Sequence, residues 1–120
     1  MRILIVDDSK AMRMILARTL RQAGYDGHDV VQATNGREAL DLVRDCEPDL
    51  VISDWNMPEM SGIELLTALR CAGFTVPFGF VTSESSTQSR ELAASEGATF
   101  LIAKPFSADD FSAVLDGVLT

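Results

Sequence analysis

The chain has 120 residues, a net charge of −8 and a hydrophobic content of 47%. This length and composition fit one globular domain with a substantial core, and they argue against a disordered chain. The acidic excess argues against general nucleic-acid binding, which needs clustered lysine and arginine side chains. No apolar run approaches the roughly 20 residues that span a bilayer, and residues 1–8 turn acidic too soon for a signal peptide. We therefore expect a single cytoplasmic domain over residues 1–120, without membrane insertion.

The first predicted strand covers residues 2–6, which are apolar on both faces as in the centre of a parallel sheet. Ser9 follows as a suitable N-cap, and apolar residues at helical spacing then predict a helix that ends at Gly24. Residues 28–33 predict a second strand, whose polar side chains suit the edge of a sheet. The chain therefore begins with a strand, a helix and a second strand.

A helix and a third strand lead to the centre of the sequence. The pair Asn35-Gly36 predicts a turn, and apolar residues over 39–46 then predict a helix that closes before a proline. Residues 50–53 form a nearly continuous apolar run that ends at Asp54. A buried strand therefore delivers one carboxylate to a loop that extends to Gly62.

The alternation of helices and strands continues through the second half of the chain. The remaining predicted elements are a helix over 63–73, a strand over 76–81 that ends at Thr82, a helix over 86–97, a strand over 99–103 and a last helix after residue 107. The helix over 86–97 has a thin apolar stripe, so we expect it to be the least firmly packed helix. Ser107 and Asp110 have the spacing of a capping box at the start of the last helix.

Five strand–helix alternations with short connections predict an α/β fold with a five-stranded parallel sheet and helices on both faces. Right-handed crossovers leave few strand orders, of which 2-1-3-4-5 is common for five strands. In that flavodoxin-like order the winding reverses between the first and third strands. Ligands of such sheets bind at this reversal, beyond the carboxyl ends of the strands.

Polar side chains occupy the predicted strand ends in a pattern that favours metal-assisted chemistry. Asp7 and Asp8 follow the first strand, Asp54 the third, and Lys104 the fifth, while Thr82 ends the fourth. Three neighbouring carboxylates repel one another unless a cation joins them, and oxygen ligands without histidine or cysteine favour Mg²⁺. Any one of these residues alone has an ordinary interpretation as a turn former, helix cap or surface residue. Their coincidence at four strand ends favours a functional site.

Carboxylates, Mg²⁺ and a lysine suit phosphoryl transfer, where catalysis is mainly positioning and charge neutralisation. Asp54 is the expected nucleophile, which gives a covalent aspartyl phosphate. Lys104 and the metal would hold phosphoryl oxygens, and Thr82 would donate a hydrogen bond to one of them.

The combined motifs resemble those of the receiver domains of two-component response regulators, and the resemblance covers the whole chain. They are Asp7-Asp8, Asp54-Trp55-Asn56-Met57-Pro58, Thr82 and Lys104-Pro105-Phe106. Within that family, the segment around Asp54 and Val81-Thr82-Ser83-Glu84 most resemble the stand-alone chemotaxis regulators of the CheY type. The resemblance implies that Asp54 accepts a phosphoryl group from the phosphohistidine of a histidine kinase.

The resemblance also implies roles for individual residues. Asp8, Asp54 and the backbone carbonyl of Asn56 would bind Mg²⁺ directly, with Asp7 acting largely through water. Thr82 would move toward the phosphoryl group, and Asn56 and Glu84 would influence the rate at which that group is lost to water. Such a protein is expected to be a signalling switch and not an enzyme, although it catalyses its own phosphorylation and dephosphorylation.

The implied output surface consists of the fourth helix, the fifth strand and the fifth helix. Because no output domain follows the last predicted helix in this sequence, we expect phosphorylation to change binding to a separate partner. Chemotaxis or motor control is the favoured role. A phosphorelay intermediate and a regulator of another enzyme are the alternatives, and the sequence does not name the kinase, the target or the oligomeric state.

One position departs from the family pattern. Receiver domains usually place an aromatic residue three positions before the lysine, as a rotamer switch coupled to the threonine. Here that position is Leu101, and the aromatic residue lies one position earlier, at Phe100. Adjacent strand residues face opposite sides of a sheet, so Phe100 cannot replace the switch residue without a bulge or a register shift.

Two other classes of protein fit the sequence less well. A phosphatase of the haloacid dehalogenase type needs Asp-x-Asp after the first strand, whereas Asp7 and Asp8 are adjacent. A flavin-binding electron carrier shares the strand order but needs a phosphate-binding loop rich in Ser, Thr and Gly at the same place, where the two acids would repel a phosphate.

The remaining reactive or charged residues have ordinary interpretations. Cys46 and Cys71 lack metal-type spacing and are expected to be small, buried apolar residues. His28 is expected to be a solvated residue of the edge strand. A solvated helix face is the favoured interpretation of a basic cluster in the first helix, with docking of an acidic partner left open. The cluster comprises Lys10, Arg13, Arg18 and Arg21.

Overall fold

The computed structural model describes residues 2–25, 27, 29–83 and 86–118. Its strands are Arg2–Val6 (β1), Asp29–Ala33 (β2), Leu50–Ser53 (β3), Phe78–Thr82 (β4) and Phe100–Ala103 (β5). Its helices are Lys10–Gln22 (α1), Gly36–Cys46 (α2), Gly62–Cys71 (α3), Thr87–Ser95 (α4) and Ala108–Val118 (α5). The strict alternation predicted from the sequence is confirmed.

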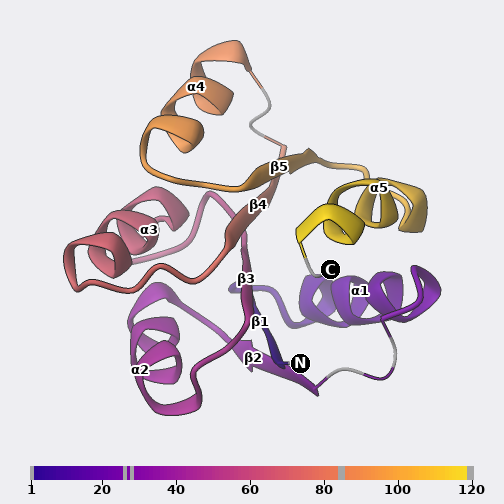
Figure 1. Ribbon diagram of the computed structural model, residues 1–120, viewed down its shortest axis with the longest axis horizontal. Coiled ribbons are helices and arrows are strands. Elements are labelled where there is room, and N and C mark those ends of the chain that lie inside the picture. Colours follow the sequence, from indigo (N-terminus) through magenta and orange to yellow (C-terminus); the bar gives the residue numbers. More distant parts are fainter. Residues whose placement is uncertain (1, 26, 28, 84–85, 119–120) are drawn as a thin grey trace.

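The strands form one parallel sheet in the order β2-β1-β3-β4-β5, as predicted. Figure 1 shows the sheet between two layers of helices, with α2, α3 and α4 on one face and α1 and α5 on the other. Helices on both faces explain why the central strands are largely apolar and buried. The winding reverses between β1 and β3, so their carboxyl ends lie side by side.

Each face of the sheet has its own hydrophobic core, because successive strand residues point in opposite directions. On the α2–α3–α4 face, Val6 and Val51 pack with Phe80 of β4. On the α1–α5 face, Ile5 and Ile52 pack with residues of both helices. Paired strands with both faces covered form a rigid support for the residues at their ends.

The helix starts are fixed by side-chain caps. The oxygen of Ser9 accepts the Met12 N–H at 3.2 Å, which confirms the predicted N-cap of α1. The predicted capping box of α5 is also confirmed, since Ser107 and Asp110 each accept the other's backbone N–H, at 3.3 and 2.8 Å. Asn35-Gly36 was predicted as a separate turn, and this was wrong. Asn35 is the N-cap of α2, because its side chain accepts an N–H of the first helical turn.

Three further expectations concern the start of β4, the burial of the cysteines and the packing of α4. β4 begins at Phe78 instead of residue 76, since Pro77 has no N–H for the ladder. The prediction of buried cysteines was wrong for Cys71, which is exposed at the end of α3, while Cys46 is half-buried. The weak packing predicted for α4 is confirmed, because Ala93 is its one buried side chain.

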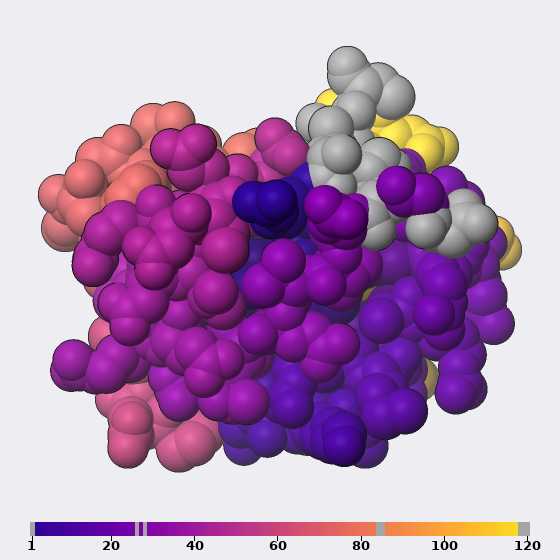
Figure 2. Space-filling model, turned by 90° about the horizontal axis from the view of Figure 1, so that it is seen from below, coloured from indigo at the N-terminus to yellow at the C-terminus, as the bar shows by residue number. Residues whose placement is uncertain are grey.

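β2 lies at the edge of the sheet, as its polar residues predicted. Figure 2 views the molecule from this side, where atoms of the first half of the chain cover most of the surface. The expectation for His28 lies outside the described residues. None of the helices in the described part of the chain combines the length and the apolar character needed to span a bilayer.

Candidate functional site

The carboxyl ends of β1 and β3 bring three carboxylates together, as the predicted topology required. One oxygen from each of Asp7, Asp8 and Asp54 lies within 4.8 Å of the other two. Asp7 is buried, Asp54 is half-buried and Asp8 is exposed. The site therefore has a buried base at Asp7 and an open mouth, exposed to solvent, at Asp8.

The main chain around Asp54 is held on several sides. The Asp54 N–H donates to the Val6 carbonyl at 2.9 Å, which continues the pairing of β1 with β3 past the last assigned residue. Its own carbonyl accepts the Ser53 hydroxyl at 2.8 Å. That carbonyl also lies so close to Gly62 that a Cβ there would be 2.2 Å from the oxygen. The loop between β3 and α3 therefore needs glycine at this position to hold Asp54 in place.

The side chain of Asp54 receives two donors on one oxygen. The Trp55 backbone N–H donates to Asp54 Oδ1 at 2.8 Å, and the Lys104 ammonium lies 3.4 Å from the same atom. The indole of Trp55 packs against Phe80, with ring centroids 4.8 Å apart. Because the tryptophan adjoins the carboxylate through its own backbone, its fluorescence can report on changes at the site.

Asp7 carries a buried oxygen that is unsatisfied. Asp7 Oδ1 accepts the Ser9 N–H at 2.9 Å, but Oδ2 has no hydrogen-bond partner among the described residues. Burial raises the pKa of the Asp7 carboxyl from 3.8 to about 6, and the negative charge of Asp54 adds to the increase. A buried acceptor without a partner is costly, so this carboxyl needs either a proton or a cation.

The residues present fit a hard divalent cation. The donor set consists of oxygen atoms, and the open mouth on the Asp8 side leaves room for bound water, which Mg²⁺ usually retains. The orphaned Asp7 Oδ2 is the observation that most favours a cation here, because an ion would compensate an acceptor that the protein leaves unsatisfied.

Two more of the predicted residues lie at neighbouring strand ends. Lys104 follows β5 and forms the ion pair with Asp54. Thr82 is fully buried at the end of β4, opposite Ala103 in the register. Asn56 is exposed in the loop after Trp55. The prediction for Glu84 lies outside the described residues.

Arg13 was missed as a contributor to the site. Its guanidinium donates to the Asp7 backbone carbonyl at 2.7 Å and to the Gln32 side chain at 3.1 Å. Lys10, Arg18 and Arg21 are exposed, as the interpretation of a solvated face requires, but Arg13 is half-buried. Helical spacing alone identified a charged face, and no sequence signal showed that one of its members reaches the first strand end.

Comparison with known proteins identifies the family. Residues 3–116 match the model of the response regulator receiver domain. The chain belongs to this family. Receiver domains act in two-component signalling, where they accept a phosphoryl group from a kinase, act on a downstream target and generally bind Mg²⁺ at an acidic pocket.

Relatives of two lengths match this receiver domain. A chemotaxis protein CheY homolog of Campylobacter jejuni is 38% identical over 122 residues, which cover 99% of this chain and 92% of that protein. The response regulator MprA of Mycolicibacterium vanbaalenii is 36% identical over 118 residues, 98% of this chain but only 50% of MprA. The chain therefore spans half the length of one of these relatives and nearly all of the other.

Solved structures agree with the fold. The chemotaxis protein CheY4 of Vibrio cholerae superposes with a TM-score of 0.86 at 35% identity, covering 98% of this chain and 97% of that one. The receiver domain of the Francisella response regulator 1452 gives a TM-score of 0.85 at 27% identity, with coverages of 98% and 94%. The flavodoxin-like fold predicted from the sequence is thus shared with receiver domains of known structure.

The structure places Phe100 and Leu101 on opposite faces of β5, as the alternation of strand residues predicted. Phe100 pairs with Gly79 in the register, and its ring covers that glycine on the α1–α5 face; a Cβ on Gly79 would lie 2.0 Å from the Phe100 ring. Leu101 pairs with Phe80 and packs on the opposite face, toward α4. The Phe100 ring therefore packs in the core on the α1–α5 face, and the aliphatic side chain of Leu101 lies at the position that the resemblance predicts to be the switch.

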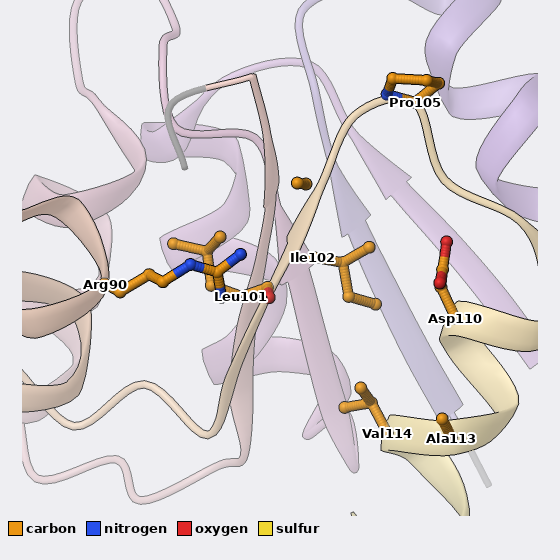
Figure 3. Close-up of a pocket in the computed structure, with 8 residues that line it drawn as sticks. Arg90, Leu101, Ile102, Pro105, Asp110, Ala113 and Val114 are labelled. Carbon is orange, nitrogen blue, oxygen red and sulfur yellow. Dashed lines mark hydrogen bonds between the residues drawn. The ribbon is translucent and has the colours of Figure 1, made fainter. Parts of the chain in front are cut away.

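A groove of about 400 Å³ opens beside β5, between α4 and α5. Figure 3 shows Arg90 extending from α4 over the strand near Leu101, with residues of α5 on the other side. Arg90 Nη1 donates a long hydrogen bond of 3.5 Å to the Leu101 carbonyl. The groove is lined by Arg90, Leu101, Ile102, Ala103, Pro105, Asp110, Ala113 and Val114.

Proposed function

We propose that this receiver domain is a phospho-accepting switch in which Asp54 takes a phosphoryl group in a Mg²⁺-dependent reaction. One observation carries the proposal: oxygens of Asp7, Asp8 and Asp54 converge within 4.8 Å, while the buried Asp7 Oδ2 has no hydrogen-bond partner in the described part of the chain. A structural cluster would satisfy that atom internally. A site that receives a cation leaves it for the ligand.

The chemistry follows from what each residue can do. An oxygen of Asp54 attacks phosphorus, a P–O bond forms, and the P–N bond to the donor histidine breaks, with the histidine nitrogen keeping the electron pair and taking up a proton. Lys104, which pairs with Asp54 in the unphosphorylated protein, would then pair with the incoming phosphoryl oxygens. The Thr82 hydroxyl would donate a hydrogen bond to one of these oxygens. Asp8, Asp54 and the Asn56 carbonyl would hold Mg²⁺, with Asp7 acting largely through water; when bound, the ion neutralises negative charge on the transferred group.

The test is incubation of the protein with a small acyl phosphate or phosphoramidate and Mg²⁺, followed by intact mass measurement. We expect the mass of one phosphoryl group on the wild-type chain and none on Asp54→Asn. Equal gain by Asp54→Asn would show that the nucleophile is elsewhere. No gain by the wild-type chain would overturn the function.

The same proposal covers the partners. A histidine kinase, or another phosphohistidine protein, would supply the phosphoryl group, and the domain would catalyse its own phosphorylation and dephosphorylation in the cytoplasm. Phosphotransfer profiling against candidate kinases tests this. Rapid transfer from one kinase identifies the donor, whereas onward transfer from Asp54 to a second histidine protein would favour the phosphorelay alternative.

The face formed by α4, β5 and α5 would bind the downstream partner. The groove beside β5 and the sparse packing of α4 support this assignment, because a helix with one buried side chain can shift at low cost. A role in chemotaxis or motor control is favoured by the similarity to chemotaxis proteins that this chain matches over nearly their full length. Phosphorylation-dependent binding to another enzyme would instead favour the alternative role as a regulator of that enzyme.

A further inference from the structure

Arg13 is connected to the metal-binding end of β1 in a way that the receiver-domain motifs do not account for. It belongs to the second turn of α1, and its guanidinium reaches back past Ser9 to the strand end. There it donates to the Asp7 backbone carbonyl at 2.7 Å, a length typical of a strong charge-assisted hydrogen bond. The contact is with the main chain that joins the two adjacent acids.

A second hydrogen bond fixes the guanidinium itself. Arg13 Nε donates to the Gln32 side-chain oxygen at 3.1 Å, and Gln32 belongs to the edge strand β2. The neighbouring residue Ala33 accepts the Asp7 N–H through its carbonyl at 3.1 Å. The peptide groups on both sides of the Asp7 Cα are therefore tied, one directly to β2 and one through Arg13.

These contacts constrain the acids that would hold the ion. The Asp7 carbonyl belongs to the peptide that leads into Asp8, so fixing its direction limits the rotation that would turn the Asp8 carboxylate away from Asp7 and Asp54. Asp8 is exposed and gains no such restraint from burial. An arginine suits this task because its rigid fork can satisfy two acceptors at once.

We propose that Arg13 is a positioning residue for the Mg²⁺ site, acting through the Asp7 carbonyl on the placement of Asp7 and Asp8. The inference rests on the proposed function, since it assumes that the three carboxylates bind the ion. Positioning of the acids by Arg13 should strengthen Mg²⁺ binding, whereas its charge alone should weaken it, because a cation near the site repels Mg²⁺.

Because positioning and charge change the Mg²⁺ affinity in opposite directions, the experiment measures the Mg²⁺ dissociation constant from Trp55 emission. Arg13→Met removes the donors and the charge at similar side-chain length. We expect the dissociation constant to rise about three- to tenfold, the size of the net contribution of one ordinary hydrogen bond. Arg13→Lys keeps the charge without the fork and should also bind more weakly. Unchanged or tighter binding by a folded Arg13→Met would overturn the inference.

Two further variants separate geometry from charge and from folding. Arg18→Met removes an equal charge from an exposed position of the same helix, and its dissociation constant should stay within about twofold of wild type. Gln32→Leu removes the second anchor without changing α1 or any carboxylate. It should weaken binding about two- to threefold, and it provides the test if thermal melting shows that Arg13→Met is unfolded. Unchanged binding by Gln32→Leu would then overturn the inference.

Failure of the proposed function has a different signature. If Trp55 emission of the wild-type protein does not respond to Mg²⁺, the ion does not bind as proposed, and both claims fall. A normal wild-type response together with an unaltered response of Arg13→Met contradicts the role of Arg13 alone.

Discussion

The carboxyl edge of the sheet and the α4–β5–α5 face differ in how firmly their functional side chains are held. At the edge, Asp54 is fixed by pairing with β1, by the Trp55 N–H and by the ion pair with Lys104. On the other face, α4 contributes one buried side chain, and the Arg90 contact with β5 is a long 3.5 Å. The edge that carries the proposed chemistry is thus held at several points, whereas α4, in the face proposed for output, is sparsely packed.

The two regions also differ in their agreement with the family. The edge carries the acids, threonine and lysine of the predicted site, whereas β5 has Leu101 where the resemblance predicts an aromatic residue, and the Phe100 ring covers Gly79. From this difference we predict that the proposed phosphorylation chemistry can be changed independently of its readout. Metal binding and phosphoryl transfer need carboxylate oxygens held in fixed positions. Signalling to a partner needs only a helix or strand with two arrangements of similar free energy.

The largest effect is expected from Lys104→Met. Loss of the ammonium 3.4 Å from Asp54 Oδ1 should slow phosphorylation by a small phosphodonor about a hundredfold, because a charge that stabilises the transferred group is removed. Mg²⁺ affinity should not fall, since a nearby cation has been deleted. Lys10→Met, at an exposed position of α1, is the control. A rate within threefold of wild type would show that Lys104 does not act in the reaction.

Gly79→Ala tests the locked position of Phe100. The added Cβ would lie 2.0 Å from the ring, so we expect a loss of about 1–3 kcal/mol in the free energy of unfolding, measured by urea denaturation. Phe100→Leu in the same chain should restore part of the loss. Gly117→Ala in α5, where a Cβ meets nothing within 4 Å, should be neutral or slightly stabilising. Equal effects of the two alanine substitutions would refute the steric account.

The raised pKa of Asp7 predicts the pH dependence of the metal-free protein. The pKa of this acid is about 6 in the folded chain, above its ordinary 3.8. The folded state therefore keeps this proton to higher pH than the unfolded state, and the associated stability is lost as pH rises from about 4 to above 6. The loss should be about 1–2 kcal/mol, allowing for solvent at the open mouth of the site.

The matched control for this prediction is Asp7→Asn, which removes the titrating group. Denaturation in the presence of a chelator at several pH values should show a smaller decrease for the variant than for wild type over this range. Excess Mg²⁺ should restore the stability of wild type at neutral pH. Parallel pH profiles of the two proteins would contradict the assignment to Asp7.

The smallest effect on chemistry is expected from Leu101→Tyr, which restores an aromatic residue at the switch position. Leu101 packs against the core on the α4 face and lines the groove beside β5, so the phosphorylation rate should change by less than about twofold. Hydrogen exchange of the α4 amides should respond more strongly to phosphorylation than in wild type. A tenfold loss of rate would show that readout and chemistry are not separable in this domain.

The sequence was sufficient for the fold and for the gathering of the acids. Apolar runs that end in Asp7, Asp54 or Lys104 are visible along the chain, and the strand order alone brings such ends together. Contacts that depend on side-chain reach were not predictable. Arg13 spans from a helix to a main-chain carbonyl, and periodicity says nothing about such a reach.

Two other features depend on the three-dimensional arrangement of the chain and were not predictable for similar reasons. The sequence showed that Phe100 and Leu101 must face opposite sides, but the contact of the ring with Gly79 depends on the register of β5 against β4. The unsatisfied oxygen of Asp7 depends on local hydrogen-bond geometry after β1. Asn35 was misinterpreted because an Asn-Gly pair suits both a turn and a helix start.

The most direct test of the account measures the initial rate of phosphoryl gain on Asp54 as Mg²⁺ is titrated, alongside Trp55 emission in the same samples. We expect the phosphorylation rate to be negligible without Mg²⁺ and to saturate at the same Mg²⁺ concentration as the change in Trp55 emission. A rate that is independent of Mg²⁺, or that saturates far from the emission change, would contradict it.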